Sequence, residues 1–167
     1  PQVAPYVPPV GTAVEFGRWR VENLGEEPVL QGAGVRRDVR ISTPASTSGD
    51  TRESHDVTHL HFLEWPNYGV ASVASLAALV RLADAEWSSH TAEGTRMLVH
   101  CSGGVGRSGA FVATHHAWRT CRAPSSASTV AVAVASAVRQ LREQRHPWMV
   151  ETEEQMDLVH KAVERLL

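Results

Sequence analysis

An apolar run followed by a glycine-rich turn most constrains how this chain can fold. Residues 97–109 read MLVHCSGGVGRSG, in which Met97–His100 is typical of a central strand and a helix is expected to begin near Arg107. A strand, a glycine-rich turn and a helix start together point several backbone N–H groups into one concavity, to which the helix dipole adds partial positive charge. The sequence therefore predicts an anion-binding loop at a strand-to-helix turn.

The side chains of this loop suit covalent chemistry on a phosphoryl group. Its glycines let the backbone curve without filling the hollow, and the planar guanidinium of Arg107 matches two oxygens of a phosphoryl group. Cys101 lies next to His100 and near Arg107, so we expect a lowered thiol pKa and a nucleophilic thiolate. Ser108 is placed to hydrogen-bond the sulfur. The residues expected to bind the phosphoryl group are Ser102, Gly103, Gly104, Val105, Gly106 and Arg107.

Other interpretations of the loop explain less of it. Cys101 could be a small buried side chain at a strand end, as free cysteines often are, but this leaves the glycines and Arg107 unexplained. A Walker-type phosphate loop is excluded because no Gly-Lys-Ser/Thr follows, and a dinucleotide-binding fingerprint is excluded because its three-glycine spacing is absent.

Composition limits the remaining classes of function. The 167 residues suffice for one domain, and 43% hydrophobic with 20% charged residues is a globular profile. A formal net charge of −2 gives no electrostatic reason to expect nucleic acid or an anionic membrane as partner. The two cysteines form no CxxC pair and no disulfide framework, which favours a reducing, cytoplasmic location. No apolar run is long enough to span a membrane, and the start lacks the order of a signal peptide.

The first half of the chain is rich in predicted strands and the second half in predicted helices. The prolines of residues 1–10 indicate a linker or an edge segment. Alternation and turn residues predict strands within residues 14–30, 34–42 and 55–65, with a tight turn at 66–69. Helical spacing predicts helices at residues 72–87, from 107 onward, at 129–145 and through 156–166. The sequence thus predicts helices packed on a sheet.

The motif HC-x5-R-[ST], formed by His100, Cys101, Arg107 and Ser108, resembles the signature of the protein tyrosine phosphatase family, in its tyrosine-specific branch. This resemblance implies an α/β domain with a mixed, highly twisted central sheet flanked by helices. It also implies hydrolysis of phosphotyrosine in proteins through a cysteinyl-phosphate intermediate, phosphotyrosyl proteins as partners, and no metal or organic cofactor.

Two further stretches resemble the family in the same order. EWPNYGV, residues 64–70, resembles the mobile loop that carries the family's general acid, and LREQRHPWMVETEEQ, residues 141–155, resembles the tract that leads to its glutamine loop. The resemblance implies that Gln155 orients the hydrolytic water, although Thr152 and Gln155 also form a capping box for the last helix. By the same resemblance Cys101 is the nucleophile, Arg107 binds phosphate and Ser108 assists thiolate release. His100 is expected to tune the pKa of the Cys101 thiol.

The chain also departs from the family. It matches about the C-terminal two-thirds of the catalytic domain, so residues 1–167 are expected to form a single domain without the N-terminal part that carries the phosphotyrosine-recognition loop. Glu151 stands where the family has the first glutamine of the glutamine loop. Met156 replaces the tyrosine after the second glutamine, and Ala71 replaces the proline that usually follows GV.

The departure with the largest chemical consequence is Asn67, which stands where the family has an aspartic acid. An amide cannot donate a proton at neutral pH, and general acid help to a tyrosine leaving group of pKa ~10 is worth about 10²–10⁴-fold. Glu64 is a candidate substitute acid, although most surface carboxylates are merely solvated. Three functions stay open: a phosphatase, slow or with a relocated acid; a catalytically impaired phosphotyrosine-binding module; and an interaction domain whose loop binds no phosphate.

His59 and His61 share one face of a predicted strand and could begin a metal site, but no third ligand follows at a useful spacing. We therefore expect no metal. The sequence indicates neither the substrate protein nor the oligomeric state.

Overall fold

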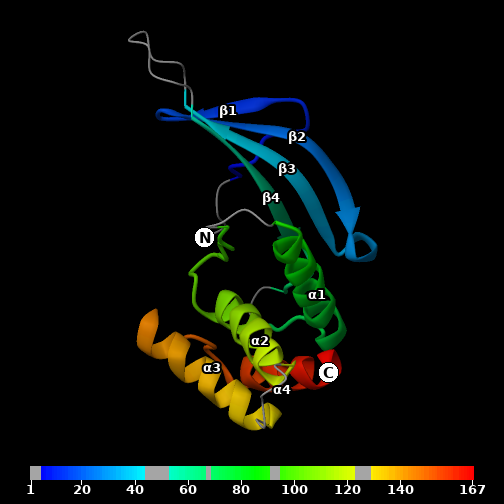
Figure 1. Ribbon diagram of the computed structural model, residues 1–167, viewed down its shortest axis with the longest axis vertical. Coiled ribbons are helices and arrows are strands. Elements are labelled where there is room, and N and C mark those ends of the chain that lie inside the picture. Colours follow the sequence, from blue (N-terminus) through cyan, green and yellow to red (C-terminus); the bar gives the residue numbers. More distant parts are fainter. Residues whose placement is uncertain (1–4, 44–52, 67–68, 91–94, 123–128) are drawn as a thin grey trace. The chain divides into compact units, whose positions relative to one another are not determined.

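The structure, a computed structural model, describes residues 5–43, 53–66, 69–90, 95–122 and 129–167. The described residues up to Leu63 form one compact unit, which holds a β sheet, and those from Glu64 onward form a second, which holds four helices (Figure 1). The predicted α/β class is confirmed. The organisation as a single domain stays a prediction.

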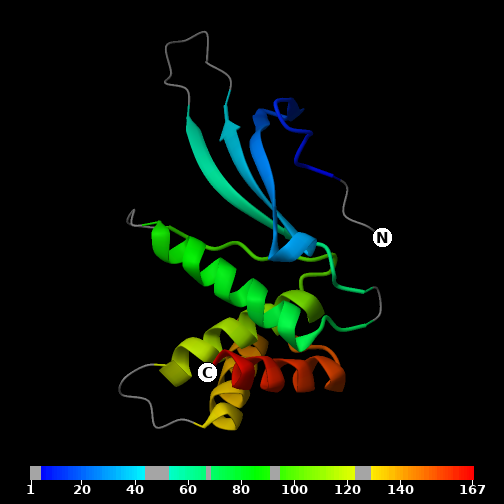
Figure 2. The same cartoon turned by 90° about the vertical axis from the view of Figure 1, so that its right-hand side faces the viewer.

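The sheet unit has four strands in the order β1-β2-β3-β4, each antiparallel to its neighbour (Figure 2). β2 pairs with the whole of β3 from Arg20 onward, apart from a bulge between Asn23 and Gly25. The strands are β1 (Ala13–Phe16), β2 (Trp19–Val29), β3 (Gly34–Ser42) and β4 (Ser54–Phe62), with a short 3-10 helix, η1 (Leu30–Gly32), between β2 and β3. All lie in or beside the ranges predicted from alternation.

Asn23 of β2 holds the segment that precedes the sheet. It is fully buried, its Nδ2 donates to the carbonyl oxygen of Pro8 at 2.9 Å, and its own carbonyl oxygen accepts from the N–H of Gly11 at 2.8 Å. The described part of the Pro-rich start, residues 5–10, forms no helix or strand.

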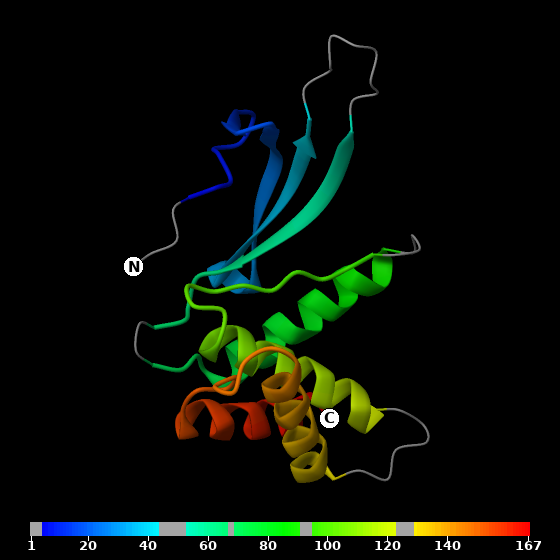
Figure 3. The ribbon, with the colours of Figure 1, turned by 90° about the vertical axis from the view of Figure 1, so that its left-hand side faces the viewer.

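The helical unit is built from four capped or closely packed helices. They are α1 (Val73–Ser89), α2 (Gly106–Arg122), α3 (Val130–Gln144) and α4 (Glu153–Leu166), close to the predicted ranges. The hydroxyls of Ser72, Thr129 and Thr152 cap α1, α3 and α4 by accepting backbone N–H groups of the first turn. α3 and α4 pack beside α2 (Figure 3), and alanines and valines form their shared core. None of the helices in the described residues has the length and apolar character needed to cross a membrane.

The segment Met97–His100 corrects one prediction from the sequence. We expected a central strand covered on both faces, but these residues have no regular secondary structure and Leu98 is 90% exposed. A strand requires neighbouring strands for its N–H and C=O groups, and in the described residues strand pairing is confined to β1–β4. The strand prediction for 97–100 is therefore wrong, and the described sheet is antiparallel throughout rather than mixed.

α2 comes very close to the chain at residues 149–150, and glycine makes this possible. A Cβ atom at Gly109 would lie 2.6 Å from the backbone nitrogen of Val150. Arg142 of α3 fixes the same turn, because its Nε and Nη2 donate to the carbonyl oxygens of Met149 and Val150 at 3.1 and 3.2 Å. Val150 has φ 58°, a conformation that β-branched residues rarely adopt. Its side chain is 1% exposed, so burial in the core holds the strained turn in place.

We predict that Gly109→Ala lowers the free energy of unfolding by about 1–3 kcal/mol, because the added methyl group forces α2 and the 149–150 turn apart. Urea denaturation of the whole chain measures this difference. Gly103→Ala is the matched control, since a Cβ at Gly103 meets no atom within 4 Å. Equal destabilisation by both substitutions would contradict the prediction.

Candidate active site

The glycine-rich loop leads directly into α2, which begins at Gly106, one residue before the predicted start. Gly104 has φ 71°, a conformation that favours glycine. In this conformation the N–H of Gly104 donates to Sγ of Cys101 at 3.2 Å. The sulfur therefore lies on the side of the loop toward which backbone N–H groups point, at the positive end of the α2 dipole.

The pKa of the Cys101 thiol lies below its ordinary value. Partial burial raises this pKa, but hydrogen bonding from the Ser108 side chain and from the backbone N–H groups of Ser108, Gly104 and Val105 lowers it by more. Each of these donors stabilises the thiolate relative to the thiol. The lowered pKa that the motif predicts thus has its cause in neutral hydrogen-bond donors of the loop.

Ser108 is suited to follow the charge on the sulfur. The residue is 5% exposed, and its Oγ makes no hydrogen bond of ordinary geometry within the described residues. The Ser108 hydroxyl is among the groups that lower the pKa of the Cys101 thiol. A buried hydroxyl without another acceptor gains a hydrogen bond by turning toward a thiolate.

The other residues predicted for the site lie on the same loop. Arg107 is half-buried in the first turn of α2. His100 is exposed, and its Nδ1 lies 3.3 Å from the carbonyl oxygen of Cys101. Ser102 and Gly103 are exposed, whereas Gly106 is buried. The roles assigned to these residues stay predictions.

Gln155 lies against the loop from the side of α4. A Cβ atom at Gly106 would be 2.8 Å from Nε2 of Gln155 and 2.9 Å from Oε2 of Glu151. The N–H of Gln155 donates to Oγ1 of Thr152, which confirms Thr152 as the cap of α4. Oε1 of Gln155 accepts from the N–H of Glu151 at 2.9 Å, whereas a capping box would use the N–H of the cap residue itself. Gln155 therefore both stabilises the start of α4 and borders the phosphate loop.

Asn67 lies outside the described residues. On either side of it, the N–H of Gly69 donates to the carbonyl oxygen of Pro66 at 3.4 Å. The indole nitrogen Nε1 of Trp65 donates to the carbonyl oxygen of Gly69 at 3.0 Å.

Glu64, the candidate substitute acid, is exposed and is engaged at the start of α1. Its Oε2 accepts from Oγ of Ser75 at 3.4 Å, and Oγ of Ser75 in turn interacts with Oγ of the cap residue Ser72 at 2.9 Å. These contacts favour a role for Glu64 at the start of α1 over a role as a substitute acid.

Two arginines to which no sequence pattern assigns a role also lie in this region. Arg142 holds the 149–150 turn, and Nη2 of Arg145 would lie 3.4 Å from a Cβ atom at Gly104. Basic residues near the C-terminus of a helix are common because they interact with its dipole. Because of this general preference, the sequence alone does not indicate the specific contacts that Arg142 and Arg145 make.

His59 and His61 lie beside Arg37, whose Nη1 is 3.5 and 3.4 Å from their Nδ1 atoms. In the part of the chain that the structure describes, no three His, Cys, Asp or Glu side chains form a group that could hold a metal ion.

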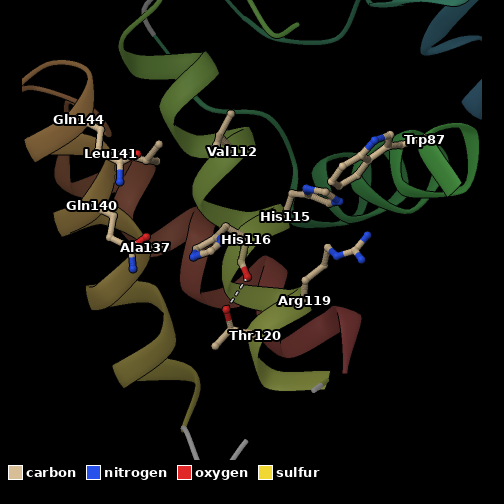
Figure 4. Close-up of a pocket in the computed structure, with 10 residues that line it drawn as sticks. All are labelled: Trp87, Val112, His115, His116, Arg119, Thr120, Ala137, Gln140, Leu141 and Gln144. Carbon is tan, nitrogen blue, oxygen red and sulfur yellow. Dashed lines mark hydrogen bonds between the residues drawn. The ribbon is translucent and has the colours of Figure 1, made fainter. Parts of the chain in front are cut away.

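A separate groove of about 540 Å³ lies on the helical unit, between side chains of α1, α2 and α3 (Figure 4). Its α2 residues begin at Val112, more than one helical turn from Gly106. Asp84 organises one wall, since its Oδ1 accepts from Nε2 of His115 and Nη1 of Arg119, each at 2.8 Å. The lining residues are Trp87, Val112, His115, His116, Arg119, Thr120, Ala137, Gln140, Leu141 and Gln144.

Comparison with known proteins agrees with the chemistry of the loop. The chain matches the family model described as protein-tyrosine phosphatase over residues 1–165. It is 36% identical over 116 residues to chicken receptor-type tyrosine-protein phosphatase eta. The matched region is 70% of this chain and 8% of that protein. It is 32% identical over 152 residues to human receptor-type tyrosine-protein phosphatase H (90% and 12%) and 30% identical over 118 residues to human tyrosine-protein phosphatase non-receptor type 12 (68% and 14%). The chain thus spans a small part of the length of these relatives.

We predict that Cys101 is alkylated by iodoacetamide at pH values where an ordinary peptide thiol is largely protonated and reacts slowly. The lowered pKa requires this, because thiolate is the reacting form. The rate is measured against pH by mass spectrometry in a Cys121→Ser background. Ser108→Ala should move the profile to higher pH.

The same shift predicts the sign of a stability effect. Because the folded-state pKa of Cys101 is lowered, its contribution to folding is fully present above the unfolded-state pKa and is lost as pH falls through the folded-state pKa. A Cys101 alkylation profile identical to that of a cysteine peptide would contradict both expectations.

Proposed function

Because this chain belongs to the protein-tyrosine phosphatase family, we propose that it hydrolyses phosphotyrosine in proteins through a cysteinyl-phosphate intermediate. The observation that carries the proposal is the lowered thiol pKa of Cys101, whose sulfur accepts the N–H of Gly104 at the start of α2. A nucleophile held inside an anion-binding loop is what covalent phosphoryl transfer requires.

In the first step, the thiolate of Cys101 attacks phosphorus. The S–P bond forms while the P–O bond to tyrosine breaks and the oxygen leaves with the electron pair. The guanidinium of Arg107 and the loop N–H groups bind the phosphoryl oxygens, where negative charge must be stabilised in the transition state.

In the second step, water attacks phosphorus and the thiolate departs. The N–H of Gly104 and the hydroxyl of Ser108 stabilise the sulfur as it regains negative charge. The side-chain amide of Gln155, held against Gly106, orients the water.

Asn67 makes the first step slow for phosphotyrosine, because the leaving oxygen must depart without a proton from that position. The same substitution favours a second candidate function, a phosphotyrosine-binding module that holds its ligand and turns it over poorly. Glu64 would restore the first step only by leaving the hydroxyl of Ser75.

We place this activity in a reducing compartment, the cytoplasm, where phosphotyrosyl proteins occur and a catalytic thiol stays reduced. In the same proposal residues 1–167 act as a single phosphatase-like domain.

We predict that the chain hydrolyses an aryl phosphate with an easily departing oxygen, such as p-nitrophenyl phosphate, and hydrolyses a phosphotyrosyl peptide far more slowly. Asn67→Asp should raise turnover of the peptide by about 10²–10⁴-fold and change that of p-nitrophenyl phosphate much less, because general acid help matters most for a poor leaving group. Release of inorganic phosphate measures both rates.

Cys101→Ser is the control and should abolish both activities. Equal, rapid turnover of both substrates would contradict the missing acid, and Glu64→Gln would then be the next variant. Peptide binding without any release of phosphate would select the binding module. Failure to bind phosphate, vanadate or phosphopeptide would support an interaction domain.

A further inference from the structure

A carboxylate borders the phosphate loop at Gly106. A Cβ atom at this glycine would lie 2.9 Å from Oε2 of Glu151 and 2.8 Å from Nε2 of Gln155. Both side chains therefore lie against the same position, one residue before Arg107. Glu151 is exposed, so its carboxylate is accessible to water as well as to the loop.

The backbone that carries Glu151 is held on both sides. Before it, Val150 has φ 58° and is buried, and Nη2 of Arg142 donates to its carbonyl oxygen at 3.2 Å. After it, the N–H of Glu151 donates to Oε1 of Gln155 at 2.9 Å. Strained backbone that the surrounding structure fixes in place is concentrated at functional sites. Here the strained turn directs a carboxylate toward the loop that carries the nucleophile.

The second step of the proposed reaction needs a proton acceptor. Water that attacks phosphorus must lose a proton, and Asn67 has an amide, which does not accept one at neutral pH. Glu64 is engaged by the hydroxyl of Ser75 at the start of α1. Glu151 is a carboxylate with a defined place beside the loop.

We propose that Glu151 is the general base for hydrolysis of the cysteinyl phosphate, an inference that rests on the proposed function. The oxygen of a water molecule bonds to phosphorus, and one proton of that water passes to the Glu151 carboxylate. The S–P bond breaks, its electron pair returns to Cys101 as thiolate, and inorganic phosphate leaves. Gln155 orients the same water through its amide.

A base differs from a phosphate-binding residue in its effect on affinity. The negative charge of Glu151 repels a phosphate dianion, so its removal is not expected to weaken binding of inorganic phosphate or vanadate. A loss of turnover without a loss of vanadate affinity therefore identifies a role in the chemical step.

Pre-steady-state kinetics with p-nitrophenyl phosphate separates the two steps, because the first releases p-nitrophenol and the second releases phosphate. We expect Glu151→Gln to keep a burst of one p-nitrophenol per protein at the wild-type rate and to slow the steady state by about 10²-fold or more. Formate added to Glu151→Ala should restore part of the steady-state rate by acting as the missing base. Glu153→Gln removes the same charge two residues away and should leave the burst and the steady state at their wild-type rates.

Steady-state turnover of Glu151→Gln equal to that of the wild type would overturn the inference while leaving the proposed function intact. So would an equal slowing of burst and steady state, or an absence of rescue by formate. No p-nitrophenol release by the wild type above that of Cys101→Ser would overturn the proposed function, and the role of Glu151 with it.

Discussion

The close approach of α2 to the chain at Val150 is the contact on which the site depends. Gly109 has no side chain to hold the two segments apart, and Arg142 donates to the carbonyl oxygens of Met149 and Val150. Since the glycine-rich loop precedes α2 and Glu151 follows Val150, this contact sets the distance between the loop that carries Cys101 and the side chains of Glu151 and Gln155. The helical core of small side chains serves this geometry, because alanines let α2, α3 and α4 pack closely.

Electrostatics in the loop depends on neutral donors as well as on charges. Burial opposes ionisation of Cys101, yet backbone N–H groups and the Ser108 hydroxyl more than offset it. The carboxylate of Glu151 lies at the edge of this environment, where its charge is tolerable because it reaches water.

The sequence predicted the loop, the helices and the strands of the sheet unit because each depends on local patterns. Small residues around Cys101 identified the loop, and the spacing of apolar residues identified the helices, with Thr152 as the cap of the last one. The apolar run Met97–His100 predicts a strand but forms none, since a strand exists only where another strand pairs with it.

Contacts between residues far apart in the sequence could not be predicted from such local patterns. The positive φ of Val150 follows from packing between α2, α3 and the turn, and no sequence pattern places Glu151 beside Gly106. Resemblance to the family marked Glu151 as unusual, but only the contact at Gly106 gave the difference a chemical meaning.

The covalent intermediate is tested most directly by mass spectrometry of the protein denatured rapidly during turnover of p-nitrophenyl phosphate. We predict that the peptide containing Cys101 gains the mass of one phosphoryl group and that the corresponding peptide of Cys101→Ser does not. Measurable turnover with an unmodified Cys101 peptide, or with the phosphoryl group on another residue, would contradict nucleophilic catalysis by this thiolate.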